Sequence, residues 1–117
     1  MRSLGFIPDD QVSWSPVEKK AGRYAFDRAY SAQCAVIREK VQKMAAKASS
    51  PSDLWKMHDY LSKERKRTDR LFDYRYSVLL QIFGILLRQV WIHTDDLAGL
   101  SDEKLEKIRR WAELMSK

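Results

Sequence analysis

The chain has 117 residues, of which 44% are hydrophobic and 32% are charged, so it is long enough for one domain with a modest core. This hydrophobic content excludes a wholly disordered chain, and four glycines with three prolines are too few for an all-β sandwich or barrel. The net charge of +6 favours anionic partners or acidic protein surfaces without choosing between them.

Cysteine content and hydropathy suggest a compartment. Cys34 is the only cysteine, so an intrachain disulfide is impossible and a reducing compartment is expected. The start, "MRSLGFIPDD", has no hydrophobic block, so we expect no signal peptide. The most apolar stretch, 76–92, is interrupted by Gln81, Arg88 and Gln89, whereas a membrane-spanning helix needs about 20 mostly apolar residues. We therefore expect a soluble, cytoplasmic protein without membrane insertion.

The first predicted element after a flexible N-terminal arm, residues 1–14, is a long helix. In "SPVE", Ser15 can cap the helix, Pro16 suits its first position and Glu18 completes a capping box. The helix should extend to about Ala48, with one apolar stripe at Phe26, Tyr30, Ile37, Val41 and Met44. A helix of roughly 32 residues is nearly three times the usual mean and overhangs the core of so small a domain.

Further helices are predicted along the rest of the chain. After the break "ASSPSD", in which Ser50 can cap the next helix, a second helix covers about 52–70. The segment "FDYRYS" then marks a bend, and a third, apolar helix covers about 74–90. "HTDDLAGL" predicts a short helical turn capped by Thr94 and closed at Gly99, and a final helix begins at Ser101. The inner face of that final helix is Leu105, Ile108, Trp111 and Ala112.

Together these elements predict an all-α fold. Residues 15–72 form a long helical hairpin and residues 73–117 form a small helical head. Because two helices offer each other only one contact line each, the hairpin leaves apolar surface uncovered. We therefore expect a homodimer that forms through the hairpin, with Leu54 and Leu61 at the dimer interface.

The second helix presents three faces at about 100° per residue. Its packing face consists of Leu54, Met57, Tyr60, Leu61, Thr68 and Leu71. A basic face consists of Lys56, Lys63, Lys66, Arg67 and Arg70. The remaining arc carries Trp55, His58, Asp59, Ser62, Arg65 and Asp69. Since aromatic and arginine residues are enriched in binding hot spots, this arc is a candidate interaction surface.

Each charged face has a structural alternative. The arc is also compatible with a polar contact between helices in which Asp59 and Arg65 form structural ion pairs, and the basic face with a solvated surface. The sequence gives little support for a catalytic site, because no Ser or Cys nucleophile has a matching loop of oxyanion-hole donors. Two histidines and one cysteine are too few ligands to indicate a metal site, and the sequence has no glycine-rich loop of the kind that binds phosphate. We expect no enzyme activity, cofactor or metal site.

Three segments carry a resemblance to a known family. "LWKMHDYLSKER", "DRLFDYRYSVLL" and "DDLAGLSDEKLEKI" resemble the fluorescence recovery protein family of cyanobacteria and its relatives, over about the last two-thirds of the chain, and "YAFDRAY" in the first helix is similar too. The resemblance implies a helical hairpin, a small head and a dimer through the hairpins. It also implies a non-enzymatic regulator without a cofactor. Such a protein binds the light-activated orange carotenoid protein through that partner's C-terminal domain, speeds its return to the orange form and releases it from the phycobilisome, which ends non-photochemical quenching.

By position, the resemblance implies a functional patch of Trp55, His58, Asp59 and Arg65, and a partner-contacting head lysine at Lys107. The chain departs from the family pattern in the head. Gln81 replaces a usual phenylalanine, and Val90 replaces a glycine. These departures leave the partner open between the orange carotenoid protein and a related carotenoid-binding domain.

The alternative function is a small basic helical adaptor that binds nucleic acid or an acidic protein surface through the basic face. Such binding weakens steeply with salt. On the leading interpretation we expect no nucleic-acid partner.

Overall fold

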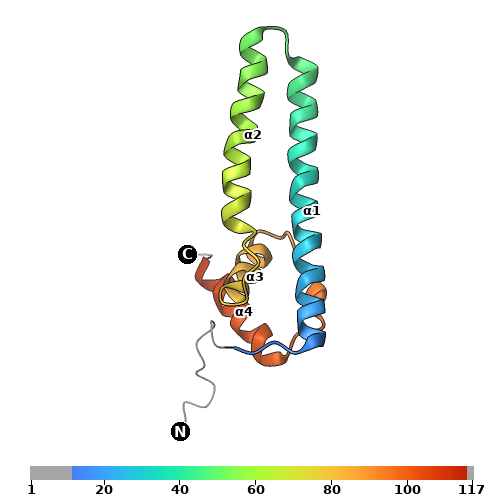
Figure 1. Cartoon of the computed structure of the whole chain (residues 1–117), viewed down its shortest axis with the longest axis vertical. Helices are drawn as coiled ribbons and strands as arrows, with labels where there is room; N and C mark the ends of the chain where they lie inside the picture. Colours follow the sequence, from blue (N-terminus) through green and yellow to red (C-terminus); the bar gives the residue numbers. More distant parts are fainter. Residues whose placement is uncertain (1–11, 116–117) are drawn as a thin grey trace.

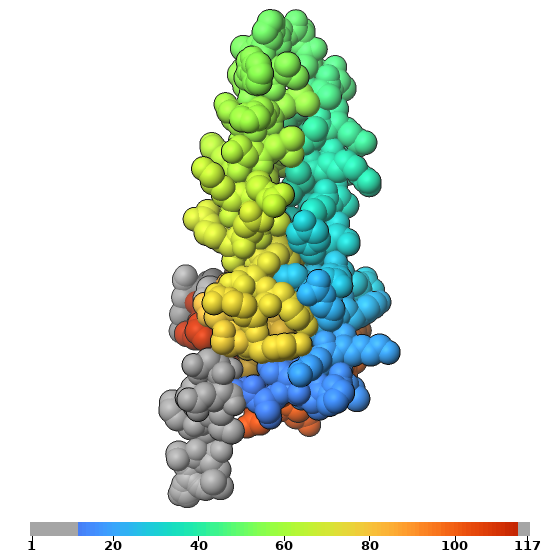
Figure 2. Space-filling view, viewed as in Figure 1, coloured from blue at the N-terminus to red at the C-terminus, as the bar shows by residue number. Residues whose placement is uncertain are grey.

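The computed structural model describes residues 12–115, which form helices and loops and contain no β-strand. The elements are α1 (Pro16–Lys47), α2 (Pro51–Leu71), α3 (Leu79–Arg88), the 3-10 helix η2 (Thr94–Leu97) and α4 (Asp102–Met115). Helices α1 and α2 run antiparallel as a long hairpin, and the later elements gather around the base of α1 (Figure 1). The molecule measures 66 × 26 × 20 Å, with the narrow hairpin rising from a wider head (Figure 2). The predicted all-α class is confirmed.

Local caps fix where the two hairpin helices begin. The backbone N–H of Glu18 donates to Ser15 Oγ at 3.1 Å, and that of Ser15 donates to Glu18 Oε1 at 3.0 Å, so the predicted capping box is present. At the start of α2, the backbone N–H of Asp53 donates to Ser50 Oγ at 3.3 Å. The starts of α1 and α2 could be predicted from the sequence because each cap involves residues only three positions apart.

The hydrophobic core lies in the head and at the base of α1. Its fully buried large side chains are Leu79, Leu80, Phe83, Leu86, Ile92, Leu97 and Ile108. From α1, buried Phe26 and the small residues Ala25 and Ala29 complete the core. A Cβ atom added to Gly84 of α3 would lie 2.4 Å from Trp111 Cβ of α4, so this glycine permits the close approach of the two head helices.

The predicted flexible arm, residues 1–14, falls largely outside the described residues. Within them, Trp14 is only 9% exposed, and its ring centroid lies 5.3 Å from that of Tyr76. The backbone carbonyl of Ser13 accepts a hydrogen bond from Lys104 Nζ at 2.7 Å. The end of the predicted arm is therefore part of the packed structure, because the apolar surface of Trp14 is covered by the head.

The third helix begins later than the predicted range of 74–90. Helix α3 begins only at Leu79, and residues 72–78 form a bend in which the Tyr74 ring packs edge-on against Phe26 at 4.8 Å. This contact joins residues 48 positions apart in sequence, so helical periodicity carries no sign of it.

At its end, α3 is stopped by Val90, whose φ of 63° lies in the left-handed region. The N–H groups of Val90 and Trp91 donate to the carbonyls of Leu87 and Leu86, at 3.1 and 2.9 Å. This is the pattern of a Schellman cap, which usually has glycine in the left-handed position.

The remaining head elements follow the prediction with one correction. The helical turn at Thr94–Leu97 is present, but its N-cap position is occupied by His93 in place of Thr94, and the His93 backbone N–H donates to Asp96 Oδ2 at 2.9 Å. Ser101 precedes α4, and its Oγ accepts the Lys104 N–H at 3.2 Å. Among the described residues, no helix combines the length and apolarity needed to cross a bilayer.

Candidate functional site

Three residues of the predicted patch form a cluster on the exposed side of α2, toward the hairpin tip. The Trp55 side chain is 62% exposed, and its ring meets that of His58 edge-on at 6.2 Å. His58 Nδ1 and Asp59 Oδ1 lie 3.3 Å apart. The structure therefore brings Trp55, His58 and Asp59 together.

Arg65 continues this surface by one to two turns and pairs with Asp69. Its Nε donates to Asp69 Oδ2 at 3.0 Å, and this hydrogen bond, reinforced by the charge of Asp69, raises the pKa of the guanidinium. Asp59 and Arg65 both take part in ion pairs, but with His58 and Asp69 of the same helix, and the contact between helices that the structural alternative expects is not seen within one chain. Each of these pairs joins side chains of α2 itself, so the surface remains open to a partner.

Two leucines border this polar and aromatic surface. Leu54 and Leu61 are 56% and 43% exposed, so one chain by itself does not cover these two members of the predicted packing face. Thr68 of the predicted packing face is buried, and Met57, Tyr60 and Leu71 are partly buried. We call the exposed set the α2 outer surface: Leu54, Trp55, His58, Asp59, Leu61, Arg65 and Asp69.

The head residues singled out by the family resemblance lie apart from this surface. Lys107 is partly buried on α4, which lies at the head end of the long molecule, whereas Trp55 belongs to the first turns of α2, the helix that starts at the hairpin tip (Figure 1). One chain therefore does not bring Lys107 together with the α2 outer surface. Gln81 is partly buried on α3, and Val90 is 64% exposed after it.

The basic face of α2 is partly neutralised by neighbouring carboxylates. Lys56 Nζ lies 3.9 Å from Asp53 Oδ1, and Arg67 Nη1 donates to Glu64 Oε2 at 2.8 Å. Arg67 and Arg70 also line a pocket toward the head. The basic face is therefore less uniformly positive than the sequence suggests, because carboxylates pair with some of its lysines and arginines.

Sequence reasoning missed one charged cluster, which joins hairpin and head. Lys104 is 6% exposed, and its Nζ contacts a Glu18 carboxylate oxygen at 3.1 Å as well as the Ser13 carbonyl. The available signal was the spacing of Lys104 four residues before Ile108, which places it on the buried side of α4. Within residues 12–115, no group of three or more His, Cys, Asp or Glu side chains is arranged to hold a metal ion.

Comparison with known proteins identifies the family of this chain. The family model described as "Photoprotection regulator fluorescence recovery protein" matches residues 14–112. The chain belongs to the fluorescence recovery protein family. The fluorescence recovery protein of Synechocystis is 32% identical over 104 residues, which span 89% of this chain and 95% of that protein. The family resemblance of the three sequence segments is thereby confirmed, and with it a role in the regulation of photoprotection.

Solved fluorescence recovery proteins have the same fold. The structure from Fremyella diplosiphon superposes with a TM-score of 0.80 at 37% identity, and that from Synechocystis with 0.81 at 32% identity. Each superposition covers 86% of this chain and 99% of the solved chain. This fluorescence recovery protein family member therefore has the family's helical architecture over nearly its whole described length.

Proposed function

We propose that this family member is a non-enzymatic regulator that binds photoactivated orange carotenoid protein, or a related carotenoid-binding domain. It accelerates the return of that partner to the inactive orange form and so ends photoprotective quenching. The observation that carries the proposal is the α2 outer surface, where an exposed tryptophan, an Asp69-bound arginine and two exposed leucines share one side of a helix. Tryptophan and arginine anchors beside apolar contacts are typical of protein-binding hot spots.

The regulator acts by binding and makes no covalent bond. It must bind one state of its partner, or the transition between states, more tightly than the other, since equal affinity for both states shifts nothing. Trp55 supplies apolar contact area, and Arg65 supplies a charged hydrogen-bond donor directed by Asp69. His58 and Asp59 complete the polar part of the contact, and Lys107 is a second contact point from the head.

The assembly that we propose is a homodimer through the hairpin. Leu54 and Leu61 are large apolar side chains of α2 that are about half exposed. Burying such side chains between two copies stabilises association by about 25 cal/mol for each Å² of apolar surface removed from water. The dimer interface would then adjoin the residues proposed to bind the carotenoid protein.

The second candidate, a basic adaptor for nucleic acid or an acidic surface, is supported by the lysines and arginines of α2. Its affinity should fall steeply with salt and should not depend on Trp55. The regulator should depend on Trp55 and Arg65 and only modestly on salt.

The test of the regulator is a dark relaxation experiment. Purified protein is added to photoactivated orange carotenoid protein, and the return of the orange absorbance is timed at low and at moderate salt. We expect faster relaxation at both salt concentrations and a loss of this effect in Trp55→Ala. Relaxation at the uncatalysed rate would count against the proposal, and salt-sensitive binding to duplex DNA would favour the adaptor.

A further inference from the structure

A pocket between the hairpin and the head lies away from the α2 outer surface. Its volume is about 520 Å³, which is within the range of about 300 to 1,000 Å³ common for small-molecule sites. At about 100° per residue, its α2 residues Tyr60, Glu64 and Arg67 fall on another side of the helix than Trp55 and Arg65. The pocket is therefore separate from the proposed partner-binding surface.

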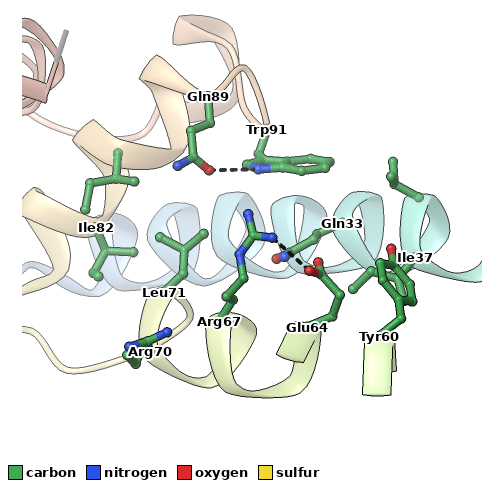
Figure 3. A pocket seen from close by; sticks show the side chains of 12 residues that line it. Gln33, Ile37, Tyr60, Glu64, Arg67, Arg70, Leu71, Ile82, Gln89 and Trp91 are labelled. Atoms are coloured by element: carbon green, nitrogen blue, oxygen red, sulfur yellow. Dashed lines mark hydrogen bonds and ion pairs between the residues drawn. The ribbon is translucent and has the colours of Figure 1, made fainter. Parts of the chain in front are cut away.

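The walls of this pocket are mainly apolar and come from α1, α2 and the head (Figure 3). The apolar lining residues are Val36, Ile37, Leu71, Ile82, Ile85 and Trp91. The Trp91 indole N–H donates to Gln89 Oε1 at 3.1 Å, which holds the ring beside the opening. A ligand with a flat apolar body would pack against this ring and the facing aliphatic side chains.

One buried acceptor lines the pocket without a donor. Gln33 of α1 is 7% exposed, and among the described residues no protein group donates a hydrogen bond to its buried Oε1. Its side chain extends from α1 toward Glu64 and Arg67 (Figure 3). Leaving a buried amide oxygen without a donor is unfavourable, so the site favours a ligand that brings an N–H or O–H group to Gln33.

The charged side chains of the pocket favour an anion. Arg67, Arg70 and Glu64 are its charged lining residues, which leaves one positive charge in excess. The Glu64 carboxylate is already bound by Arg67 Nη1 at 2.8 Å. Guanidinium groups bind carboxylates through paired hydrogen bonds, so a carboxylate at the rim would be held by Arg67 and Arg70.

We propose that this pocket binds a small aromatic carboxylate that carries an additional N–H or O–H donor. The carboxylate lies between Arg67 and Arg70, the ring packs between Trp91 and Ile82, and the donor reaches Gln33 Oε1. Because these residues come from α1, α2 and the head, the bound ligand bridges the hairpin and the head. This site does not depend on the identity of the protein partner.

The test is a heteronuclear NMR titration of the intact protein with para-hydroxyphenylacetate, which has a ring, a carboxylate and a hydroxyl donor. We expect saturable shift changes at the Trp91 indole N–H and the Gln33 side-chain amide, with a low-millimolar Kd. Two matched probes isolate the ligand groups. Phenylacetate lacks the hydroxyl and should bind about threefold to tenfold more weakly, and para-hydroxyphenylacetamide lacks the charge and should bind about tenfold more weakly.

Protein variants give the reciprocal test. Gln33→Met should abolish the preference for the hydroxyl, so that the two acids bind with equal affinity, and Arg67→Met should weaken both acids about tenfold. Lys63→Met, a charge change of the same size on α2 outside the pocket, should leave binding unchanged. The three probes are compared on the parent protein, so this part of the test does not depend on whether any variant folds. Absence of saturable changes at Trp91 and Gln33, or equal binding of the three probes, would overturn the proposal.

Discussion

At the level of single residues, the ammonium of Lys104 lies between the Ser13 carbonyl, at 2.7 Å, and the Glu18 carboxylate, at 3.1 Å. The same carboxylate accepts backbone N–H groups of Ser15 and Ser101, at 3.0 and 3.1 Å. Burial opposes ionisation of Glu18, but these hydrogen bonds and the charge of Lys104 outweigh it and lower its pKa from 4.5 to about 2. One carboxylate thus joins the start of α1 to the start of α4.

This cluster should make stability depend on acid pH. Because the folded-state pKa of Glu18 is depressed, its contribution is fully present above pH 4.5 and is lost as pH falls from 4.5 toward 2. Glu18→Gln leaves Lys104 buried without a counter-charge and should lower the free energy of unfolding by about 3 kcal/mol at neutral pH. Urea denaturation of parent and variant at neutral pH and near pH 3 measures both effects. A stability difference that does not shrink in acid would contradict this account of Glu18.

Val90 is a residue whose backbone conformation is unfavourable for its side chain. A left-handed φ of 63° costs a β-branched residue about 1 to 2 kcal/mol, and the Val90 side chain is 64% exposed, so it regains little by burial. Val90→Gly should therefore raise the free energy of unfolding by about 1 kcal/mol and Tm by about 5 °C.

The control is Ala98→Gly, which introduces glycine at an exposed residue with a φ of −62° and should lower Tm instead. Differential scanning calorimetry compares the two variants. A lower Tm for Val90→Gly would show that the Val90 side chain makes a stabilising contact that outweighs its strain.

At the level of elements, the head depends on the close packing of α3 against α4. A Cβ atom at Gly84 would lie 2.4 Å from Trp111 Cβ and 3.1 Å from the Ala112 backbone nitrogen, so Gly84→Ala must push the helices apart. We expect a loss of about 1 to 3 kcal/mol in the free energy of unfolding.

Gly22→Ala in α1 is the control, because its added Cβ would meet Trp14 at an ordinary 3.4 Å. Alanine is favoured over glycine in a helix by about 1 kcal/mol, so this variant should be as stable as the parent or more stable. Chemical denaturation of both variants tests the packing. Equal stability of Gly84→Ala and the parent would mean that α3 and α4 adjust without cost.

The starts of the helices differ in how well they can be predicted from the sequence. The starts of α1 and α2 were predictable because Ser15 and Ser50 cap residues three positions away. The start of α3 was not, because the packing of Tyr74 on Phe26 holds the preceding segment out of the helix.

A similar limit applies to the candidate sites. Helical periodicity predicted that Trp55, His58, Asp59 and Arg65 share one side of α2, and their common exposure agrees with it. The pocket was not predictable, since it joins side chains of α1, α2 and the head that only the folded chain brings together.

At the level of the whole molecule, we expect two copies to associate through their hairpins. Leu54 and Leu61 leave large apolar surface on an elongated molecule, and this surface would be covered in a dimer. Light scattering should give about twice the chain mass of 13.8 kDa at micromolar concentration. Leu54→Glu should shift the population to monomers, because burying an unpaired carboxylate costs several kcal/mol.

Lys63→Glu places a carboxylate on the basic face of α2, away from Leu54, and with a charge change of −2 against −1 it is the more demanding control; it should leave the dimer intact. A parent protein with the mass of a single chain would refute the proposed dimer. A dimeric Leu54→Glu would place Leu54 outside the interface.

The central claim is that the α2 outer surface acts on a photoactivated partner, and Arg65→Lys tests it most directly. Lysine preserves the charge and nearly preserves helix propensity, so fold and assembly should be unchanged. It cannot reproduce the planar guanidinium, whose Nε binds Asp69 at 3.0 Å and whose remaining geometry suits forked bonding and stacking. The measurement is the dark relaxation rate of photoactivated orange carotenoid protein, with size-exclusion profiles as the check on assembly. We predict that Arg65→Lys loses most of the acceleration while Lys66→Ala, on the basic face, retains it. Full acceleration by Arg65→Lys would contradict the claim and assign Arg65 a structural role in α2.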